Sequence, residues 1–389
     1  MLNSPISLTS LASISPLGMD PKAIWEAYCD QRHRISKTSI GKHSFWAAVL
    51  DGQLRAEVAK LRETSNQYAK LDDSVLFAIH ASRRAVAEAG WEAGADFGIN
   101  IGSSRGATSL FETYHGEFLK SGKTPTLSSP TTTLGNIASW VAHDLKSGGP
   151  TISHSITCST ALHALINGVA WLQSGLADKF LVGGSEASIT PFTIAQMRAL
   201  KIYAEGDHDY PCEALQLDKP TNTMVLGEGA AVACLEKGQR PWAIATIVGM
   251  GYATEPLQHS VSLSSDAKCF QDAMRMALGS METDAIDMVV MHAPGTIKGD
   301  RSEVAAIQKV FGKRQPMLTT NKWKIGHTFG ASGMLSVELA VLMLRNQKAV
   351  PVPFVTSEPY TGPVDRVMVN AVGFGGNAVS IVLERPGIG

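Results

Sequence analysis

One segment of the chain, ITCSTALHALINGVAWLQSG, places a cysteine between an apolar run and a predicted helix. Apolar residues recur on one face of that helix from Leu162 to Leu172, and Gly175 ends it. Cys158 therefore lies at a helix N-terminus, where exposed backbone N–H groups and the helix dipole stabilise a thiolate. We expect Cys158 to be a nucleophile whose pKa lies below that of the other thiols. A buried structural cysteine is the alternative that this position leaves open.

Two further segments each deliver a histidine into a turn. In MVVMHAPGTIKGDRSE an apolar strand ends at His292, and Glu303 lies in the helix that follows. In NKWKIGHTFGASG, Lys322 stands five residues before His327, and small residues then begin an apolar helix. A histidine in either place, taken alone, is more often structural. A fourth segment, NAVGFGGNA, is a glycine-dense turn around Phe374 that includes Gly373 and Gly375.

Short apolar strands alternate with amphipathic helices along the whole chain. Runs such as FGINIGS, AAVACLE and AVSIVLE are typical of buried strands, whereas DSVLFAIHASRRAVAEAG and SEVAAIQKVFG have the periodicity of helices. This alternation predicts an α/β or mixed layered fold. A polar turn from Gly238 to Pro241 divides the chain into two predicted halves, residues 1–238 with Cys158 and residues 239–389 with both histidines.

The composition excludes several classes of function. The 34 Lys and Arg residues nearly balance the 35 Asp and Glu residues, and no run of five basic residues occurs. Nucleic-acid binding and a polybasic membrane anchor are therefore not expected. With 44% hydrophobic and only 18% charged residues, the chain can bury a large core.

The termini and the cysteines indicate the compartment. The first twenty residues contain no Lys or Arg, unlike a secretory signal, and no apolar stretch is long enough to span a bilayer. The five cysteines are widely spaced and never form a CxxC pair, which favours reduced thiols over disulfides or a zinc site. We expect a cytoplasmic protein without a metal site.

Taken together and in this order, the motifs resemble those of the β-ketoacyl-acyl carrier protein synthases of the thiolase superfamily. The resemblance covers nearly the whole chain. It rests on SLASISPLG, INIGSS, ITCSTALHA, VGGSEASITPFTIAQMRAL, LDKPTNTMVLGEGAA, HAPGT, the K-x-x-x-x-H spacing and GFGG. It implies a five-layered α/β/α/β/α fold made of two similar halves.

The resemblance also implies a role for each site residue. Cys158 would accept the acyl group, and His292 and His327 would be the paired histidines of the condensing site. Lys322 and Glu303 would form a supporting charged pair. Phe374, between Gly373 and Gly375, would gate the acyl tunnel, and its N–H with that of Cys158 would form an oxyanion hole.

The activity that the resemblance implies is decarboxylative condensation. An acyl group on the cysteine would react with the enolate of malonyl-acyl carrier protein, in fatty acid, polyketide or polyene-pigment synthesis, without a metal or organic cofactor. The partners would be an acyl carrier protein carrying acyl and malonyl groups and a second subunit, either a copy of this chain or a related ketosynthase-like chain.

Three other functions are alternatives to this activity. A non-catalytic subunit of the chain-length-factor type would not need Cys158, His292 and His327 together. A thiolase or starter synthase acting on coenzyme A esters would use other residues around the cysteine. A cysteine hydrolase would need water where the enolate should lie.

The sequence also departs from the family pattern near the histidines. Val290-Met291 and Ala293-Pro294 flank the first histidine, and Trp323 and Lys324 precede the second, where small or polar residues are usual. These changes favour a specialised synthase with a reshaped pocket.

Several other polar residues have simple structural interpretations. We expect surface or supporting roles for His154 and His163. We expect Arg55, Lys60 and Arg62 to lie on the outer face of a solvated helix, with carrier docking as the less favoured alternative.

Overall fold

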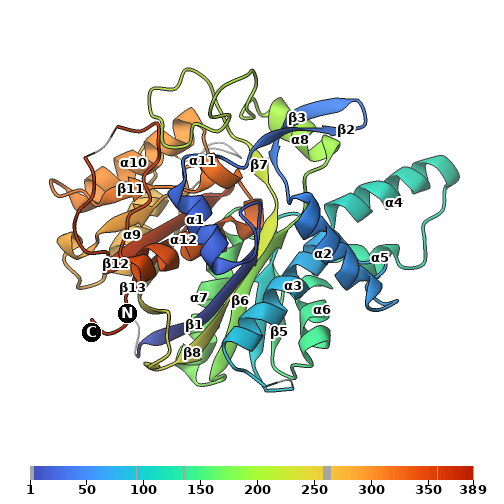
Figure 1. Ribbon diagram of the computed structural model, residues 1–389, viewed down its shortest axis with the longest axis horizontal. Helices are drawn as coiled ribbons and strands as arrows, with labels where there is room; N and C mark the ends of the chain where they lie inside the picture. Colours follow the sequence, from blue (N-terminus) through green and yellow to red (C-terminus); the bar gives the residue numbers. More distant parts are fainter. Residues whose placement is uncertain (1–3, 93, 135, 257–263, 357, 389) are drawn as a thin grey trace.

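Two five-stranded sheets form the centre of the molecule (Figure 1). The computed structural model describes residues 4–92, 94–134, 136–256, 264–356 and 358–388. The strand order of the first sheet is β1 (Ile6–Ile14), β8 (Gly229–Lys237), β6 (Lys179–Glu186), β4 (Gly98–Gly102) and β5 (Thr151–Ile152). The order of the second sheet is β11 (Met317–Thr319), β10 (Met288–Val290), β12 (Arg366–Gly373), β13 (Asn377–Glu384) and β9 (Ala245–Thr254). Strands β4, β6 and β8 of the first sheet are almost wholly buried, as their apolar runs predict.

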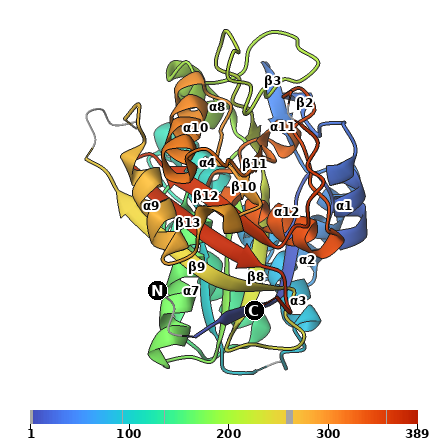
Figure 2. The same cartoon turned by 90° about the vertical axis from the view of Figure 1, so that its left-hand side faces the viewer.

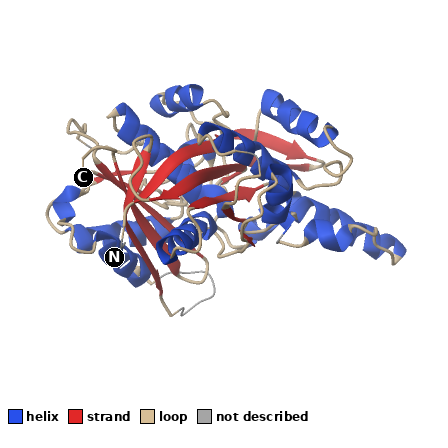
Figure 3. Cartoon of the chain, turned by 90° about the horizontal axis from the view of Figure 1, so that it is seen from below, coloured by secondary structure: helices blue, strands red, loops and turns tan. Residues whose placement is uncertain are grey.

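Helices cover and separate the two sheets. The outer face of the first sheet packs against α3 (Asp73–Glu88) and α6 (Asn136–Leu145), and the outer face of the second against α9 (Lys268–Leu278), on which α10 (Ile297–Phe311) packs in turn. Between the sheets lie α7 (Thr160–Ser174) and α12 (Ser332–Asn346). Figure 2 shows α9 beside the second sheet, and Figure 3 shows the strands inside and the helices around them. The predicted five-layered α/β/α/β/α fold is thus confirmed.

The central helix α12 is buried on every side. All its residues from Ser332 to Leu344 are buried, as expected for a helix that is apolar all round and lies between two layers. It directly follows the His327 turn. The hydrophobic core between the two sheets therefore reaches the turn that carries His327.

Smaller elements lie around this centre. A three-stranded sheet consists of β2 (Ser36–Ile40), β3 (His43–Ala48) and β7 (Leu226–Gly227). The remaining helices are α1 (Pro21–Cys29), α2 (Gly52–Glu63), α4 (Thr108–Ser121), α5 (Ser128–Thr132), α8 (Pro191–Ala199) and the one-turn α11 (Lys322–Ile325). None of the described helices is both long and apolar enough to cross a membrane.

Each sheet is drawn from one part of the chain. The strands of the first sheet all precede residue 238, and those of the second all follow it. The division into functional halves at residues 1–238 and 239–389 stays a prediction.

Candidate active site

The four chemical segments meet at one cavity of about 220 Å³. Its wall includes Cys158, His292, His327, Glu303 and the turn from Gly373 to Gly376. The rest of the wall is mostly apolar, and comprises Met197, Ile202, Asn222, Met224, Phe270, Pro294, Thr296, Lys298, Gly299, Phe329 and Val372. Seven of the eight predicted site residues therefore line a common space, and the eighth, Lys322, does not.

Cys158 follows a strained turn at the start of α7. The preceding residue, Thr157, has a φ of 48°, which is unfavourable for a β-branched side chain. The turn packs closely on Gly373, since a Cβ added there would collide with the Thr157 hydroxyl and lie 2.8 Å from the carbonyl oxygen of Ile156. Gly175 ends the helix with a left-handed conformation, as predicted. Close steric packing therefore fixes the position of the cysteine, because Gly373 of the opposite turn packs against the residues that precede it.

The predicted low pKa of Cys158 is wrong for the free protein. The thiol lies among apolar side chains such as Met224 and Phe329 and is only 6% exposed. Burial, with a smaller contribution from the Glu186 carboxylate, raises its pKa to about 12. Burial also raises the pKa of Cys212 and Cys269 to about 12, so the pKa of Cys158 does not lie below theirs. The loss of hydration outweighs the helix N-terminus, although Arg105 and Lys322 both favour the thiolate.

His292 is positioned through its backbone. The Glu303 carboxylate accepts hydrogen bonds from the N–H of His292 at 3.0 Å and of Ala293 at 2.9 Å, and Asn370 donates a third at 3.3 Å. Ala293 has a φ of 26°, so the chain turns sharply just after the histidine. Burial raises the pKa of Glu303 to about 7. Among the described residues, the His292 Nδ1 atom is buried without a partner.

His327 is positioned through its ring. The N–H of Phe329 donates a 2.9 Å hydrogen bond to Nδ1, so the neutral ring carries its proton on Nε2. Burial, followed by the charge of Lys322, lowers the pKa of His327 to about 3. Burial, then His327 and Lys322, also lowers the pKa of His292 far below its usual value. The two rings lie edge to face with their centres 5.1 Å apart, and both are neutral hydrogen-bond donors near neutral pH.

Lys322 lies behind the cavity. Its ammonium donates to Asn321 Oδ1 at 2.8 Å and to the Ser336 hydroxyl at 3.1 Å. Burial lowers its pKa to about 8, although the Glu303 charge opposes this. No ion pair joins Lys322 to Glu303 in the part of the chain that the structure describes. The predicted charged pair is therefore corrected to two separate buried groups, because each has its own hydrogen-bonding partners.

Phe374 lies at the tip of the turn between β12 and β13. Its side chain is 37% exposed, whereas Cys158, His292 and His327 are at most 6% exposed. Gly375 has a φ of 105°, which a residue with a side chain rarely adopts. Phe374 thus stands at the open side of the cavity, opposite the nucleophile turn. Its gating role and its share in an oxyanion hole stay predictions.

Sequence analysis missed two charged groups beside the cysteine. Glu186 ends β6 and accepts hydrogen bonds from the N–H groups of Ser104 at 2.8 Å and Gly330 at 3.1 Å. Burial raises its pKa to about 7. The Arg105 guanidinium lies 5.2 Å from the centre of the Phe329 ring. A glutamate at the end of a mostly apolar strand was the available signal for Glu186, whereas no local pattern pointed to Arg105.

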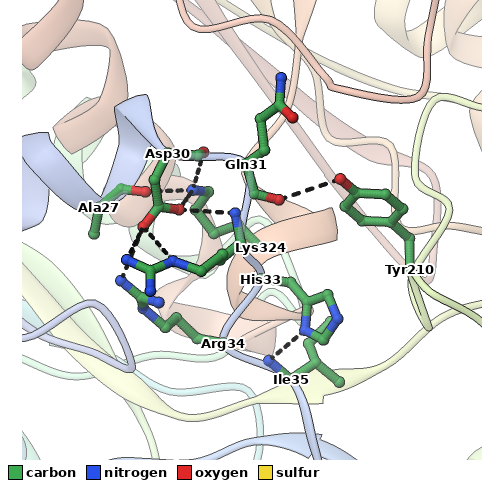
Figure 4. A network of polar contacts seen from close by, with 9 residues as sticks. Ala27, Asp30, Gln31, His33, Arg34, Ile35, Tyr210 and Lys324 are labelled. Carbon is green, nitrogen blue, oxygen red and sulfur yellow. Dashed lines mark hydrogen bonds and ion pairs between the residues drawn. The ribbon is translucent and has the colours of Figure 1, made fainter.

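Trp323 and Lys324 do not line the cavity. Trp323 packs against Tyr210 and Phe354, with ring centres 5.9 and 6.3 Å away. The Lys324 ammonium bonds to the Asp30 carboxylate at 2.9 Å and to the carbonyl oxygens of Ala27 and Asp30, as Figure 4 shows. Lys324 thus ties α11 to the end of α1. The expectation that Trp323 and Lys324 reshape the pocket from within is not supported by their positions.

Two of the basic residues of α2 form ion pairs with the rest of the fold. Arg55 pairs with Asp73 and with the buried Glu228. Arg62 also pairs with Asp73, at 2.6 Å. These two arginines are half-buried, because Asp73 at the start of α3 and Glu228 directly after β7 present carboxylates to them. The predicted outward position therefore holds only in part. Lys60 is exposed as expected.

His154 and His163 have the supporting roles that were expected. His154 contacts Asn100 Oδ1 and the carbonyl oxygen of Thr160, and His163 contacts the carbonyl oxygen of Ser159. Neither lines the cavity. Within the described ranges, no group of three His, Cys, Asp or Glu side chains could hold a metal ion.

The comparison with protein families identifies the class of this fold and site. Residues 3–240 match the N-terminal domain of β-ketoacyl synthases, and residues 244–355 match their C-terminal domain. The chain therefore belongs to the β-ketoacyl synthase family, whose members are acyltransferases that form carbon–carbon bonds.

Relatives of similar length support this assignment. The chain is 28% identical to the 3-oxoacyl-[acyl-carrier-protein] synthase 2 of Coxiella burnetii and 25% identical to that of Vibrio cholerae. Each alignment covers 98% of this chain, and 98% and 99% of the two relatives.

Solved structures share the fold. A β-ketoacyl synthase from Burkholderia phymatum matches with a TM-score of 0.83 at 22% identity, over 98% of this chain and 99% of that one. The ishigamide ketosynthase/chain length factor matches with a TM-score of 0.87 at 19% identity, over 99% and 100%. A ketosynthase in complex with a type II polyketide acyl-carrier protein matches with a TM-score of 0.85 at 19% identity, over 98% and 99%.

Proposed function

We propose that this chain condenses an acyl group held on Cys158 with the malonyl group of malonyl-acyl carrier protein, in fatty acid, polyketide or polyene-pigment synthesis. The observation that carries this proposal is the meeting of Cys158, His292 and His327 at one apolar cavity. The relatives reported above are named 3-oxoacyl-[acyl-carrier-protein] synthases, which supports a carrier-bound substrate.

The first half-reaction is acyl transfer. The Cys158 sulfur attacks the carbonyl carbon of the acyl thioester, the carbon–sulfur bond to the carrier breaks, and the carrier leaves as a thiol with the proton that Cys158 gives up. The N–H groups of Cys158 and Phe374 hold the oxyanion. The apolar wall around the cysteine excludes water from the acyl-enzyme, which disfavours a hydrolase.

The second half-reaction is decarboxylation and carbon–carbon bond formation. The malonyl thioester loses carbon dioxide, and the electron pair of the broken bond becomes an enolate with its charge on the thioester oxygen. His327, whose Nε2 carries a proton, and His292 donate hydrogen bonds to that oxygen. The enolate carbon then attacks the Cys158 thioester, and the cysteine leaves and takes up a proton.

Two neutral rings suit this task better than charged ones. A neutral imidazole stabilises the enolate oxygen without donating its proton to it fully, and the low pKa of both histidines keeps them neutral. Lys322 adds a positive charge behind the rings. Glu303 holds the turn that carries His292.

A second subunit is also part of this proposal. The edge strand β5 is short and partly exposed, and α4 reaches away from the first sheet with exposed Phe111, Phe118 and Leu119 (Figure 1). Apolar surfaces of this kind are typical of subunit interfaces. We therefore expect a copy of this chain or a related ketosynthase-like chain to cover this face, and we place the enzyme in the cytoplasm.

The non-catalytic alternative is not favoured. A subunit that only shapes a neighbour's tunnel has no physical need for a nucleophile and two neutral histidines at one cavity. A coenzyme A-dependent starter synthase or thiolase is likewise not favoured, because it would use other residues around the cysteine. The half-reactions described above separate these possibilities.

Separating the two half-reactions tests the proposal. A Cys158→Gln protein cannot be acylated, but its amide can occupy the oxyanion hole, so malonyl-carrier protein should lose carbon dioxide without chain extension. Adding His292→Ala should lower that rate about a hundredfold or more, because a preorganised donor is lost. Mass spectrometry of the carrier measures both outcomes.

A matched control is His163→Ala in the same background. This histidine is half-buried on α7 and does not line the cavity, so decarboxylation should stay unchanged. Decarboxylation that survives the loss of both His292 and His327 would contradict the mechanism.

A further inference from the structure

A lysine stands at the mouth of the catalytic cavity. Lys298 lines the same cavity as Cys158 and His327, yet its side chain is exposed, whereas the cysteine and the histidine are buried. It lies in the first turn of α10, beside Thr296 and Gly299, which also line the cavity. The cavity thus has a buried floor and a positively charged rim.

The polar groups next to Lys298 are used to build the turn. The Asn222 amide oxygen accepts the N–H of Ile297 at 2.9 Å, and its NH₂ group donates to the carbonyl oxygen of Lys201 at 2.8 Å. The Thr296 hydroxyl accepts the N–H of Gly299 at 3.2 Å. These bonds fix the backbone that carries Lys298. They leave its ammonium as the charged group that projects from a rigid support.

The carboxylates nearest in sequence are already committed. Asp300 pairs with the buried Lys219 at 2.6 Å, and Glu303 accepts the backbone N–H groups described above. Lys309, farther along the same helix, pairs with Asp266 at 2.7 Å. Across the residues that the structure describes, Lys298 has no such ion pair. Its charge is available to an anion that approaches the mouth.

The proposed substrates place an anion there. A carrier-bound thioester hangs on a phosphopantetheine arm, with sulfur at one end and a phosphate at the other. The sulfur end must reach the cavity floor at Cys158 and His327, so the arm passes through the mouth and its phosphate end stays at the outer side. Coenzyme A thioesters carry the same phosphopantetheine unit.

We propose that Lys298 binds the phosphate of the phosphopantetheine arm and thereby selects phosphorylated thioesters as donors. This inference rests on the proposed function. Lysine binds phosphate as a point charge on a flexible stem, which suits a mobile group at an open mouth. The arm is then fixed at both ends, by the histidines at the thioester and by the lysine at the phosphate.

The experiment compares donors with and without the phosphate. Decarboxylation by the Cys158→Gln protein is measured with malonyl-carrier protein, malonyl-coenzyme A and malonyl-pantetheine, with and without Lys298→Ala. Lys298→Ala should lower kcat/KM about fivefold to tenfold for both phosphorylated donors, through KM and with kcat unchanged, because one exposed charge-assisted contact is lost. The value for malonyl-pantetheine should not change. Lys309→Ala, which alters a paired lysine of the same helix, should leave all three donors unaffected.

Other outcomes would overturn the inference. An equal loss with malonyl-pantetheine would show that the side chain only shapes the mouth. A loss confined to the carrier would show a contact with the carrier's surface in place of the phosphate. Calorimetry can measure the binding of phosphopantetheine and of pantetheine to the Lys298→Ala and unaltered proteins even if neither protein turns over substrate. A failure of this inference can therefore be distinguished from a failure of the proposed reaction.

Discussion

The nucleophile turn and the two histidine turns hold their side chains by different means. Cys158 is positioned by shape, since a strained Thr157 is pressed against Gly373 of the opposite turn. The histidines are positioned by hydrogen bonds, through Glu303 for His292 and through the Phe329 N–H for His327. The cysteine side should therefore be sensitive to added volume, and the histidine side to lost partners and to pH.

The largest expected effect is on the cysteine side. Gly373→Ala would place a Cβ against the Thr157 side chain and so displace the Cys158 turn. Acylation of Cys158 should fall about a hundredfold, because a displacement of about 1 Å in a reacting group has effects of this size. The rate of acyl-enzyme formation, followed by mass spectrometry, measures it. Gly52→Ala at the start of α2, where nothing lies within 4 Å of the added Cβ, is the control.

An unchanged acylation rate in Gly373→Ala would contradict the idea that shape positions the cysteine. Decarboxylation should fall less than acylation, since the histidine turns do not rest on this contact. Equal losses in both reactions would mean that the whole cavity had collapsed.

Two buried lysines on α11 test whether the histidine side depends on a nearby charge. Lys322→Met removes a positive charge beside both rings, so decarboxylation should fall about tenfold as the developing enolate loses electrostatic support. Lys324→Met removes the lysine donor from the carbonyl oxygens of Ala27 and Asp30 and one ion pair from the Asp30 carboxylate, so the free energy of unfolding should fall by about 1–3 kcal/mol.

The two variants are matched controls for each other. Lys324→Met should keep decarboxylation within about twofold, because none of the residues in its network, which Figure 4 shows, lines the cavity. Denaturant unfolding and decarboxylation assays on both proteins measure the difference. A larger catalytic loss in Lys324→Met than in Lys322→Met would reverse our assignment of the two residues.

A further expected effect is a pH dependence of stability. The pKa of His327 is about 3 in the folded protein and near 6.5 when unfolded, so the unfolded chain takes up the proton first as the pH falls. Its contribution to stability is complete above the unfolded pKa and is lost progressively toward pH 3. Between pH 7 and pH 5 the loss is roughly 2 kcal/mol.

His327→Asn should lack that loss. The difference in unfolding free energy between the variant and the unaltered protein should therefore change by this amount between the two pH values, and urea unfolding measures it. His208→Asn, at an exposed histidine, should show no such change. A difference that does not vary with pH would mean that His327 is not held neutral by the fold.

The sequence contained enough to predict the fold and the meeting of distant residues. The order of the motifs resembled that of a known family and so predicted that Cys158, His292 and His327 share one site. The structure brings all three to one cavity. The periodic apolar face and Gly175 predicted α7 correctly, because both signals are local.

What the sequence could not predict depends on tertiary surroundings. The pKa of Cys158 is set by the apolar side chains that α8, β7 and the His327 turn pack around it. Lys322 and Glu303 do not pair, because Asn321, Ser336 and the His292 backbone compete for them. No spacing rule shows which of several buried partners is nearest.

The burial of α12 has a consequence for folding. Because both sheets enclose this helix from Ser332 to Leu344, its amide protons can exchange with solvent only when the layers separate. Its first turn begins five residues after His327, so any partial unfolding that exposes the helix also dismantles the histidine side of the site. We expect amide exchange in α12 to occur with the free energy of global unfolding, and the two sheets to fold as one cooperative unit.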